Sequence, residues 1–249
     1  INKGASTIMY CGHGSESSVV TTGFNNNNIA QLNNGDMLPF IVSVACVNGA
    51  FHKSYDCFAE AWLKKQNGGA IVTWMSTINQ PWYPPMRGQD YFYDILVGGF
   101  NYNNYSGQSG INTTEQRTTW GSLIVNACNL MLSESKTNSD VETVHTWTTF
   151  GDVSLQLRTK NPDKITSSNN TLLPGSPFKT TIKSNGQPVK DALVCISQNN
   201  KYYSALTDAN GNVSINNDFN SGTFLLVVTA YNTTTMEMVY MQVVLQVYH

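Results

Sequence analysis

Short apolar runs without clean alternation mark the first part of the chain. Residues 7–10 read Thr-Ile-Met-Tyr, residues 40–45 read Phe-Ile-Val-Ser-Val-Ala, and residues 70–76 read Ala-Ile-Val-Thr-Trp-Met-Ser. Runs of this kind, with β-branched and aromatic residues, are typical of strands that are covered on both faces of a mostly parallel sheet. Residues 154–158 are a further candidate strand.

Helical patterns lie between these runs. Residues 56–66 place Phe58, Ala61 and Trp62 at the spacing of a core-facing helix. Residues 87–97 and 117–132 are further helix candidates, and residues 98–110 between them form a loop rich in Gly, Asn and Tyr. Residues 14–39 are long enough for a helical crossover between the first two strands. These patterns predict an α/β unit, a mostly parallel sheet flanked by helices.

After residue 160 the pattern changes to short alternating runs separated by turn residues. The polar stretch at residues 157–174 is typical of a linker with turns. About seven strands at such spacing predict a β-sandwich. The runs include residues 178–182, 192–197, 202–207, 213–215, 224–231 and 238–247. We therefore expect one domain at residues 1–160 and a second, all-β domain at residues 161–249, which serves as a stabilising or spacer module.

Composition argues against two classes of partner. The 249 residues carry a formal net charge of −2 and only 12% charged residues, which gives no footprint for nucleic acid or for a membrane surface. No apolar stretch reaches the roughly 18 residues of a membrane-spanning helix. The low charge and the many Asn, Thr and Ser residues favour a bacterial protein that is secreted or held at the cell surface.

Two residues with complementary chemistry follow the first two strands. His13 lies in Tyr-Cys-Gly-His-Gly-Ser at residues 10–15, and Cys46 ends the apolar run that begins at residue 40. Because ligands bind beyond the carboxyl ends of parallel strands, neighbouring strands would bring the two side chains within reach. An imidazole that takes the proton of a thiol makes it a usable nucleophile. When such a thiol attacks a carbonyl group, the carbonyl oxygen becomes negatively charged. The backbone N–H groups of Gly14 and Cys46 are candidates to stabilise this oxyanion.

Four segments resemble the gingipains, particularly the arginine-specific type. They are Val-Ala-Cys-Val-Asn-Gly-Ala-Phe at 44–51, Cys-Phe-Ala-Glu-Ala at 57–61, Ser-Thr-Ile-Asn-Gln-Pro-Trp-Tyr-Pro-Pro-Met-Arg-Gly-Gln-Asp at 76–90, and Thr-Trp-Thr-Thr-Phe-Gly-Asp-Val-Ser-Leu at 146–155. The resemblance implies a caspase-like α/β sub-domain followed by an immunoglobulin-like β-sandwich. It also implies a cysteine endopeptidase that cleaves proteins or peptides after a basic residue, with Arg favoured over Lys, through a thioester on Cys46.

The resemblance further assigns roles to individual residues. It implies that His13 is the catalytic base and Cys46 the nucleophile, that the amides of Gly14 and Cys46 form the oxyanion hole, and that the chemistry requires no cofactor. Trp82 and Met86 correspond to walls of the primary specificity pocket, and Gln80 lies at its rim. An indole beside the stem of an Arg or Lys side chain buries apolar area and adds a cation–π interaction.

The resemblance also implies that part of the catalytic domain is missing. The gingipain acid that binds the basic substrate residue lies upstream of the catalytic histidine, and no acidic residue precedes His13 here. About four candidate strands also fall short of the usual five or six. We therefore expect a missing N-terminal chain or segment that completes the domain, as in a proteolytically matured zymogen. Gingipain-like domains carry structural calcium, for which Asp90 and Asp152 are candidates.

Two alternatives to a cysteine peptidase remain. Cys11, His13, Cys46 and Cys57 offer ligands that zinc prefers, although their spacings fit no standard zinc motif. A catalytically inactive surface or adhesion module could keep a peptidase fold, since fold alone never proves activity. The presence of His13, Cys46, the glycines that follow them (Gly14 and Gly49) and Trp82 in one chain favours the enzyme. Because the five cysteines are an odd number, at least one is unpaired within the chain.

Overall fold

The computed structural model describes residues 1–98, 118–173 and 175–241. It divides into two compact units, Ile1–Leu157 and Arg158–His249. Each unit has its own buried core, and each is described by itself. Among the described residues, no helix has the length and hydropathy needed to cross a membrane.

A four-stranded sheet forms the centre of the first unit. Its strands are β1 (Thr7–Cys11), β5 (Phe40–Val44), β6 (Val72–Ser76) and β7 (Trp147–Phe150), in that spatial order. The first three are the predicted runs and pair in parallel, whereas β7 pairs antiparallel with β6. The expected strand at residues 154–158 is wrong, since this segment makes a single isolated bridge, Thr119 to Gln156. Its place in the sheet is taken by β7.

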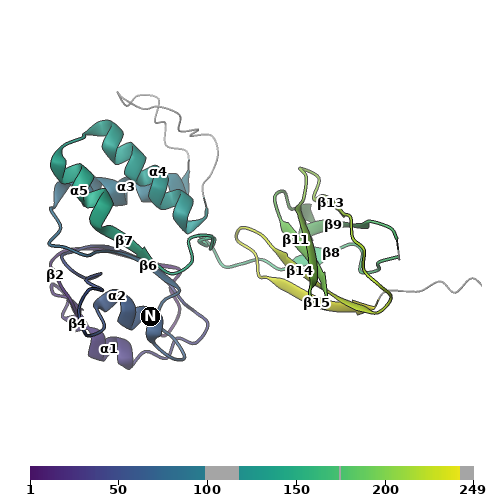
Figure 1. Ribbon diagram of the computed structural model, residues 1–249, viewed down its shortest axis with the longest axis horizontal. Coiled ribbons are helices and arrows are strands. Elements are labelled where there is room, and N and C mark those ends of the chain that lie inside the picture. The colour runs from purple at the N-terminus through teal and green to yellow at the C-terminus, as the bar shows by residue number, and fades with distance from the viewer. Residues whose placement is uncertain (99–117, 174, 242–249) are drawn as a thin grey trace, which may run out of the picture. The chain divides into compact units, whose positions relative to one another are not determined.

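Helices cover both faces of this sheet (Figure 1). They are α1 (Asn26–Ala30) and α2 (Phe58–Lys64) on one face, and α3 (Tyr83–Val97), α4 (Trp120–Glu134) and α5 (Asn138–Thr146) on the other. Alternate residues of β5 pack on opposite sides of the sheet, because successive side chains of a strand point to opposite faces. Phe40, Val42 and Val44 pack in the core under α3 and α4, and Ile41 packs in the core that contains α2.

Several element boundaries differ from those expected. The helix predicted at residues 87–97 begins at Tyr83, because Pro84 and Pro85 occupy the first turn, where backbone N–H groups need no partner in the helix. The segment 14–39 contains the small antiparallel sheet β2 (Gly14–Ser15), β3 (Ser18–Val19) and β4 (Phe24–Asn25) before the short α1, so the crossover is only partly helical. The expected loop at residues 98–110 lies outside the described residues except for Gly98.

The described strands of the second unit all pair antiparallel and form two sheets. In one sheet β10 (Gln187–Pro188), β9 (Phe178–Ser184) and β13 (Asn212–Ile215) lie in that order, and β8 (Ile165–Ser167) also pairs with β9. The other has the order β12 (Lys201–Leu206), β11 (Leu193–Gln198), β14 (Thr223–Thr229) and β15 (Met236–Met241). Side chains from both sheets, including Phe178, Ile196 and Phe224, form one core.

Candidate functional site

Parallel pairing of β1 and β5 places His13 and Cys46 beyond the same edge of the sheet. Cys11 is in register with Val44, and the Gly12 N–H donates to the Val44 carbonyl at 3.0 Å. His13 and Cys46 therefore each follow a registered residue by two positions. The crevice at the carboxyl ends of parallel strands is where open α/β sheets bind ligands.

The backbone of Gly14 lies directly against that of Cys46. A Cβ atom at Gly14 would lie 2.6 Å from the Cys46 carbonyl oxygen and 2.8 Å from Ala45 Cβ, so no side chain fits there. The Val20 N–H donates to the His13 carbonyl at 2.8 Å in the β2–β3 hairpin. This bond makes His13 and Val20 a hydrogen-bonded pair. Because hydrogen-bonded and non-hydrogen-bonded pairs alternate in antiparallel strands, the next pair, Gly14 and Val19, is not hydrogen-bonded, and the N–H of Gly14 is directed away from β3. It is free of the hairpin ladder and available to another acceptor.

Cys46 precedes a strained turn. Val47 has φ of 49°, in the left-handed region where a β-branched residue is an outlier. The turn is held by backbone hydrogen bonds from Val47 N to Ile78 O at 2.9 Å and from Gly49 N to Ser76 O at 2.8 Å. The half-buried Cys46 thiol lies 3.8 Å from the Gln80 carbonyl oxygen, to which it donates. The segment that follows β6 thus faces the thiol.

An exposed indole at the start of α3 lies beside His13, and an exposed methionine lies one turn further along the helix. The His13 and Trp82 rings are 5.4 Å apart between centroids, in an edge-to-face arrangement at 76°. Trp82 and Met86 expose 47% and 41% of their surfaces, and the Met86 N–H donates to the Trp82 carbonyl at 3.2 Å. Helical spacing therefore puts both side chains near one another at this end of α3. Large apolar groups left exposed in this way are typical of a binding surface.

The side-chain amide of Gln80 is buried without a hydrogen-bond partner at either its oxygen or its nitrogen among the described residues. Leaving a buried polar group unpaired costs about 1–3 kcal/mol, so native structures rarely do so without a functional reason. The main-chain carbonyl of the same residue accepts from the Cys46 thiol, so Gln80 is a neighbour of the thiol.

A buried amide that the sequence did not single out lies under the same turns. Asn48 is fully buried and donates to the carbonyl oxygens of Ser15 and Ser18, at 2.7 and 2.9 Å, while its own oxygen accepts from Ser43 at 2.8 Å. The polar Ser43 within an apolar strand, followed five residues later by Asn48, was the available sequence signal.

The alternative zinc site is not assembled. Cys57 is the N-cap residue of α2, and burial raises the pKa of its thiol to about 11. Cys11 is an exposed residue at the end of β1, and partial burial of its thiol together with the nearby Asp90 raises the pKa of that thiol. All five cysteines are free thiols. Among the described residues, no group of three or more His, Cys, Asp or Glu side chains is arranged to hold a metal ion.

The proposed calcium ligands do not meet either. The Asp152 carboxylate accepts hydrogen bonds at 2.8 Å from the backbone and hydroxyl of Ser154, which lower its pKa, so it works as a turn acceptor. Asp90 lines a hollow on α3 and, like Asp152, joins no cluster of three potential ligands in the described part of the chain. These side chains therefore do not by themselves fit a calcium ion.

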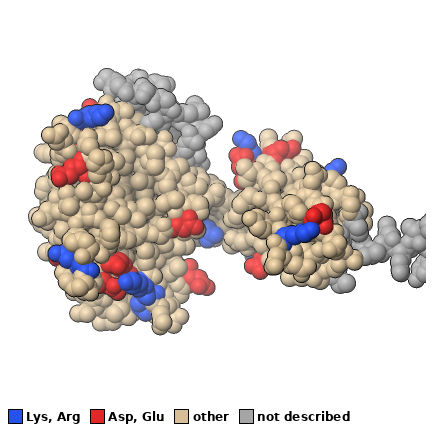
Figure 2. Space-filling model, viewed as in Figure 1, with Lys and Arg blue, Asp and Glu red and all other residues tan. Residues whose placement is uncertain are grey.

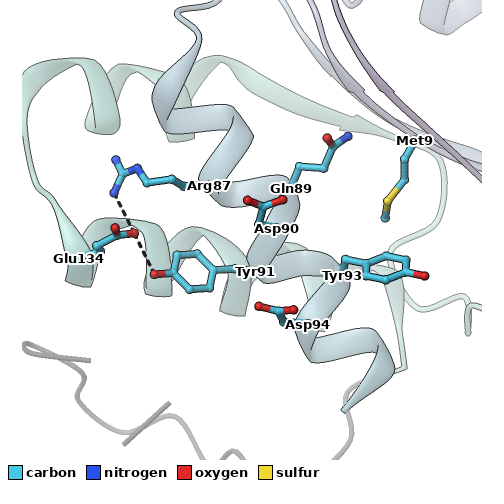
Figure 3. A pocket seen from close by; sticks show the side chains of 8 residues that line it. All are labelled: Met9, Arg87, Gln89, Asp90, Tyr91, Tyr93, Asp94 and Glu134. Carbon is cyan, nitrogen blue, oxygen red and sulfur yellow. Dashed lines mark hydrogen bonds and ion pairs between the residues drawn. The ribbon is translucent and has the colours of Figure 1, made fainter. Parts of the chain in front are cut away.

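The hollow that contains Asp90 is separate in composition from the site of His13 and Cys46. It encloses about 620 Å³ and is lined by Met9, Arg87, Gln89, Asp90, Tyr91, Tyr93, Asp94 and Glu134 (Figure 3). The Gln89 amide donates to the Tyr10 carbonyl at 3.2 Å, and Glu134 accepts from Tyr91 and Arg87 at 2.8 and 3.2 Å. These bonds tie α3 to β1 and to α4, which is a structural role.

Known proteins resemble this chain in sequence. The profile of peptidase family C25 matches residues 1–158. Gingipain R1 of Porphyromonas gingivalis is 35% identical over 243 residues, which cover 94% of this chain and 23% of that protein. Gingipain R2 of the same species is 33% identical over 244 residues, covering 94% of this chain and 31% of that protein.

Solved structures give the same picture. The crystal structure of the Arg-specific cysteine proteinase gingipain R matches with a TM-score of 0.82 and 30% identity, covering 97% of this chain and 54% of that one. A complex of the pro- and mature domains of the same proteinase matches with a TM-score of 0.81 and 30% identity, over 97% of this chain and 55% of that one. The chain thus spans about half the length of the structures, and less than a third of the curated relatives, that it matches. The matched structures combine sheets and helices in a caspase-like α/β fold.

Proposed function

The chain belongs to peptidase family C25, and we propose that its first unit carries the nucleophile and base of a cysteine endopeptidase. The observation that carries the proposal is the contact between the Gly14 backbone and Cys46, beyond the registered ends of β1 and β5. This contact puts the Gly14 backbone, whose N–H group is free of the hairpin ladder, against the residue that carries the thiol. His13 immediately precedes that glycine.

In the first half of the reaction, His13 takes the proton of the Cys46 thiol, and the sulfur attacks the carbonyl carbon of the scissile peptide bond. The N–H groups of Gly14 and Cys46 stabilise the negative charge that develops on the carbonyl oxygen. The C–N bond then breaks, and the protonated His13 gives its proton to the leaving amine. The product is a thioester between Cys46 and the acyl half of the substrate.

In the second half, water replaces the amine. His13 removes a proton from the water as its oxygen attacks the thioester carbon, and the same two N–H groups stabilise the second oxyanion. The C–S bond breaks, the sulfur recovers the proton from His13, and the acyl half leaves as a carboxylic acid. Because the enzyme returns to its starting protonation state, the chemistry uses water alone and no cofactor.

We propose that the site prefers a basic residue, Arg over Lys, on the acyl side of the cleaved bond. The exposed Trp82 and Met86 side chains support this, since they offer a flat apolar surface for the methylene stem of such a residue next to His13. The unpartnered Gln80 amide supplies hydrogen-bonding groups at the rim. A relative of this chain is described as Arg-specific.

A further portion of the peptidase is proposed to complete the site. Within the described residues β1 is the edge of the sheet, and its residues are partly exposed where those of β5 and β6 are buried. An unpaired edge is a template for another strand. We propose that the missing portion lies N-terminal to this one, supplies the acid that binds the guanidinium group, and is processed from a secreted or surface-bound bacterial precursor that also carries structural calcium.

The second unit is proposed to be an immunoglobulin-like sandwich that spaces or stabilises the peptidase. The proposed boundary between the two domains lies near residue 160 of the sequence. Its two antiparallel sheets around one core support this architecture. The described part of this unit has no group of three potential metal ligands. We therefore propose no metal-binding role for it.

Active-site labelling tests the proposed function against the alternative of an inactive surface module. The full-length protein is treated with a peptidyl-arginine chloromethyl ketone, and modified cysteines are located by peptide mass mapping. We expect stoichiometric alkylation of Cys46 that is lost in His13→Ala, with the exposed Cys11 as an internal control for nonspecific reaction. Labelling of Cys11 and Cys46 at equal rates, or labelling indifferent to His13, would identify an inactive module.

A further inference from the structure

Asn48 has every hydrogen-bonding atom of its side chain committed. Both donor bonds of its nitrogen end on main-chain oxygens of the β2–β3 hairpin, those of Ser15 and Ser18, and its oxygen accepts from Ser43 in the middle of β5. Neither the Asn48 nor the Ser43 side chain is exposed to solvent. An amide saturated in this way is fixed in orientation, because rotating it would leave two buried carbonyls facing an oxygen.

The two segments joined by this amide are those that hold the candidate site. The hairpin begins at Gly14, directly after His13, and Asn48 follows Cys46 by two residues. The paired ladder of β1 and β5 ends at Cys11 and Val44, with one more backbone bond from Gly12. Past that point the two segments diverge into separate turns. The Asn48 amide is a buried side-chain bridge between them, and the Lys53–Glu16 ion pair at 3.6 Å and the Phe58 N–H, which donates to the Glu16 carbonyl at 2.6 Å, join them further from the site.

The contact is close enough to set the spacing of the site. A Cβ atom at Gly14 would lie 3.0 Å from Asn48 Nδ2 and 2.6 Å from the Cys46 carbonyl. The amide nitrogen therefore packs under the Gly14 backbone. The main-chain carbonyl of Asn48 also accepts a hydrogen bond from the Ala59 N–H of α2 at 3.0 Å. This bond anchors Asn48 to that helix.

We propose that Asn48 is a positioning residue whose buried amide sets the spacing of the His13–Gly14 segment against Cys46. The inference rests on the proposed cysteine peptidase function and deepens it. Asn48 touches no substrate, since its polar atoms are buried and fully used. It acts by keeping the base and the Gly14 N–H in register with the sulfur. A displacement of about 1 Å in such a site can lower a rate by roughly 100-fold.

Asn34 provides a matched control within the same unit. It is also a buried asparagine, 1% exposed, whose amide donates to two carbonyls, those of Met37 and Gly69, at 2.7 and 3.0 Å, and accepts from the Gly69 N–H at 2.9 Å. The bonds of Asn34 join two loops that hold neither His13 nor Cys46. Asn34→Ala and Asn48→Ala therefore each remove three side-chain hydrogen bonds, and only the second touches the proposed site.

The test measures carbamidomethylation of Cys46 by iodoacetamide from pH 5 to 9 on the 249-residue chain. Sites are resolved by peptide mapping, and variants are compared at a temperature where circular dichroism shows them folded. We expect Cys46 of the wild type to react faster at pH 6.5 than the exposed Cys11 of the same chain, because His13 takes the proton of its thiol. In Asn48→Ala the profile moves toward that of an ordinary thiol, and the rate at pH 6.5 falls about tenfold or more. Asn34→Ala stays within about twofold of wild type at equal loss of stability.

Milder variants cover the case in which Asn48→Ala does not fold. Asn48→Ser keeps one donor, and Ser43→Ala keeps Asn48 but frees its oxygen; both are expected to slow labelling by about threefold without changing the reactivity of Cys11. Profiles of Asn48 variants that match that of Asn34→Ala would overturn the inference while leaving the proposed function standing. A wild-type profile like that of an ordinary thiol, unchanged by His13→Ala, would instead remove the proposed function itself.

Discussion

Gly14 is the residue at which backbone contact and proposed chemistry coincide. An added methyl group would lie 2.6 Å from the Cys46 carbonyl, and because that oxygen belongs to the backbone, one of the two turns must move. We expect Gly14→Ala to lower kcat of the complete peptidase by roughly 100-fold, since losing one oxyanion donor typically costs that much. Steady-state hydrolysis of an arginyl amide substrate measures the effect.

Gly121→Ala is the control for this substitution, because its Cβ would lie 3.0 Å from Val153 Cβ, a milder crowding against a side chain without contact to the site. Its kcat should stay within about twofold of wild type. Equal activity of the two variants would show that the close approach at Gly14 serves packing alone.

Gln80 has an unpaired buried amide, and this predicts two effects of opposite kind. Gln80→Leu removes polar atoms that have no partner among the described residues, so the free energy of unfolding should stay constant or rise by about 1 kcal/mol. The same change removes groups proposed to bind the substrate, so KM should rise about tenfold. Thermal denaturation and steady-state kinetics measure the two effects.

Gln89→Leu is the matched control, because the Gln89 amide donates to the Tyr10 carbonyl. Its loss should lower the free energy of unfolding by about 1 kcal/mol. A loss of stability in Gln80→Leu equal to that in Gln89→Leu would mean that the Gln80 amide is satisfied in the protein and is not held for a ligand.

At the scale of elements, one carboxylate fixes the start of α5. Asp140 is 1% exposed and accepts hydrogen bonds from Thr137 and Ser135, and it also forms an ion pair with Arg87 of α3. Burial raises the pKa of this carboxyl, but the hydrogen bonds and the guanidinium outweigh it, and the pKa lies below its ordinary value. Since α5 leads directly into β7, this cap also holds the antiparallel edge of the sheet.

The depressed pKa of Asp140 fixes the sign of a pH effect on stability. Its contribution is fully present above the unfolded pKa of about 3.9 and is lost as the pH falls through the lower native value. Asp140→Asn should lower the free energy of unfolding by about 3 kcal/mol at pH 7, since it breaks a buried pair. Urea denaturation should show the difference from wild type shrinking below pH 4. A difference that is the same at pH 3 and pH 7 would contradict this assignment.

At the scale of the whole molecule, the two units have separate cores. Ile196 is fully buried in the core of the second unit, and Ile196→Ala should lower the stability of that unit by about 2–5 kcal/mol. Alkylation of Cys46 should be unchanged, because its neighbours Gly14, Val47 and Gln80 all belong to the first unit. Val42→Ala, in the core of the first unit, is the control expected to impair labelling at elevated temperature.

Charge is sparse over the surface. On the face shown in Figure 2, basic and acidic side chains are interspersed on each unit and much of the surface is uncharged. The net charge of −2 therefore produces no single-sign field on that face. On this face, recognition of a charged group would therefore depend on nearby side chains rather than on long-range attraction.

Local pattern determined much of this protein. The runs that became β1, β5 and β6 are apolar on both faces, so the sequence alone predicts a covered parallel sheet and places His13 and Cys46 beyond its edge. The helices around Phe58, Phe92 and Leu123 follow from their apolar spacing in the same way.

Tertiary contacts decided what local pattern could not. The strand β7 follows from Trp147, whose indole stacks on Trp74 at 3.5 Å and donates to main-chain oxygens of β5 and β6, more than 70 residues away. The Asn48 amide likewise finds its partner Ser15 more than 30 residues away in the sequence. That the Gln80 amide is buried without a partner among the described residues is also visible only in the folded chain. The physical reason is that apolar periodicity reports burial along one element, whereas hydrogen-bond satisfaction is settled only when separate elements meet.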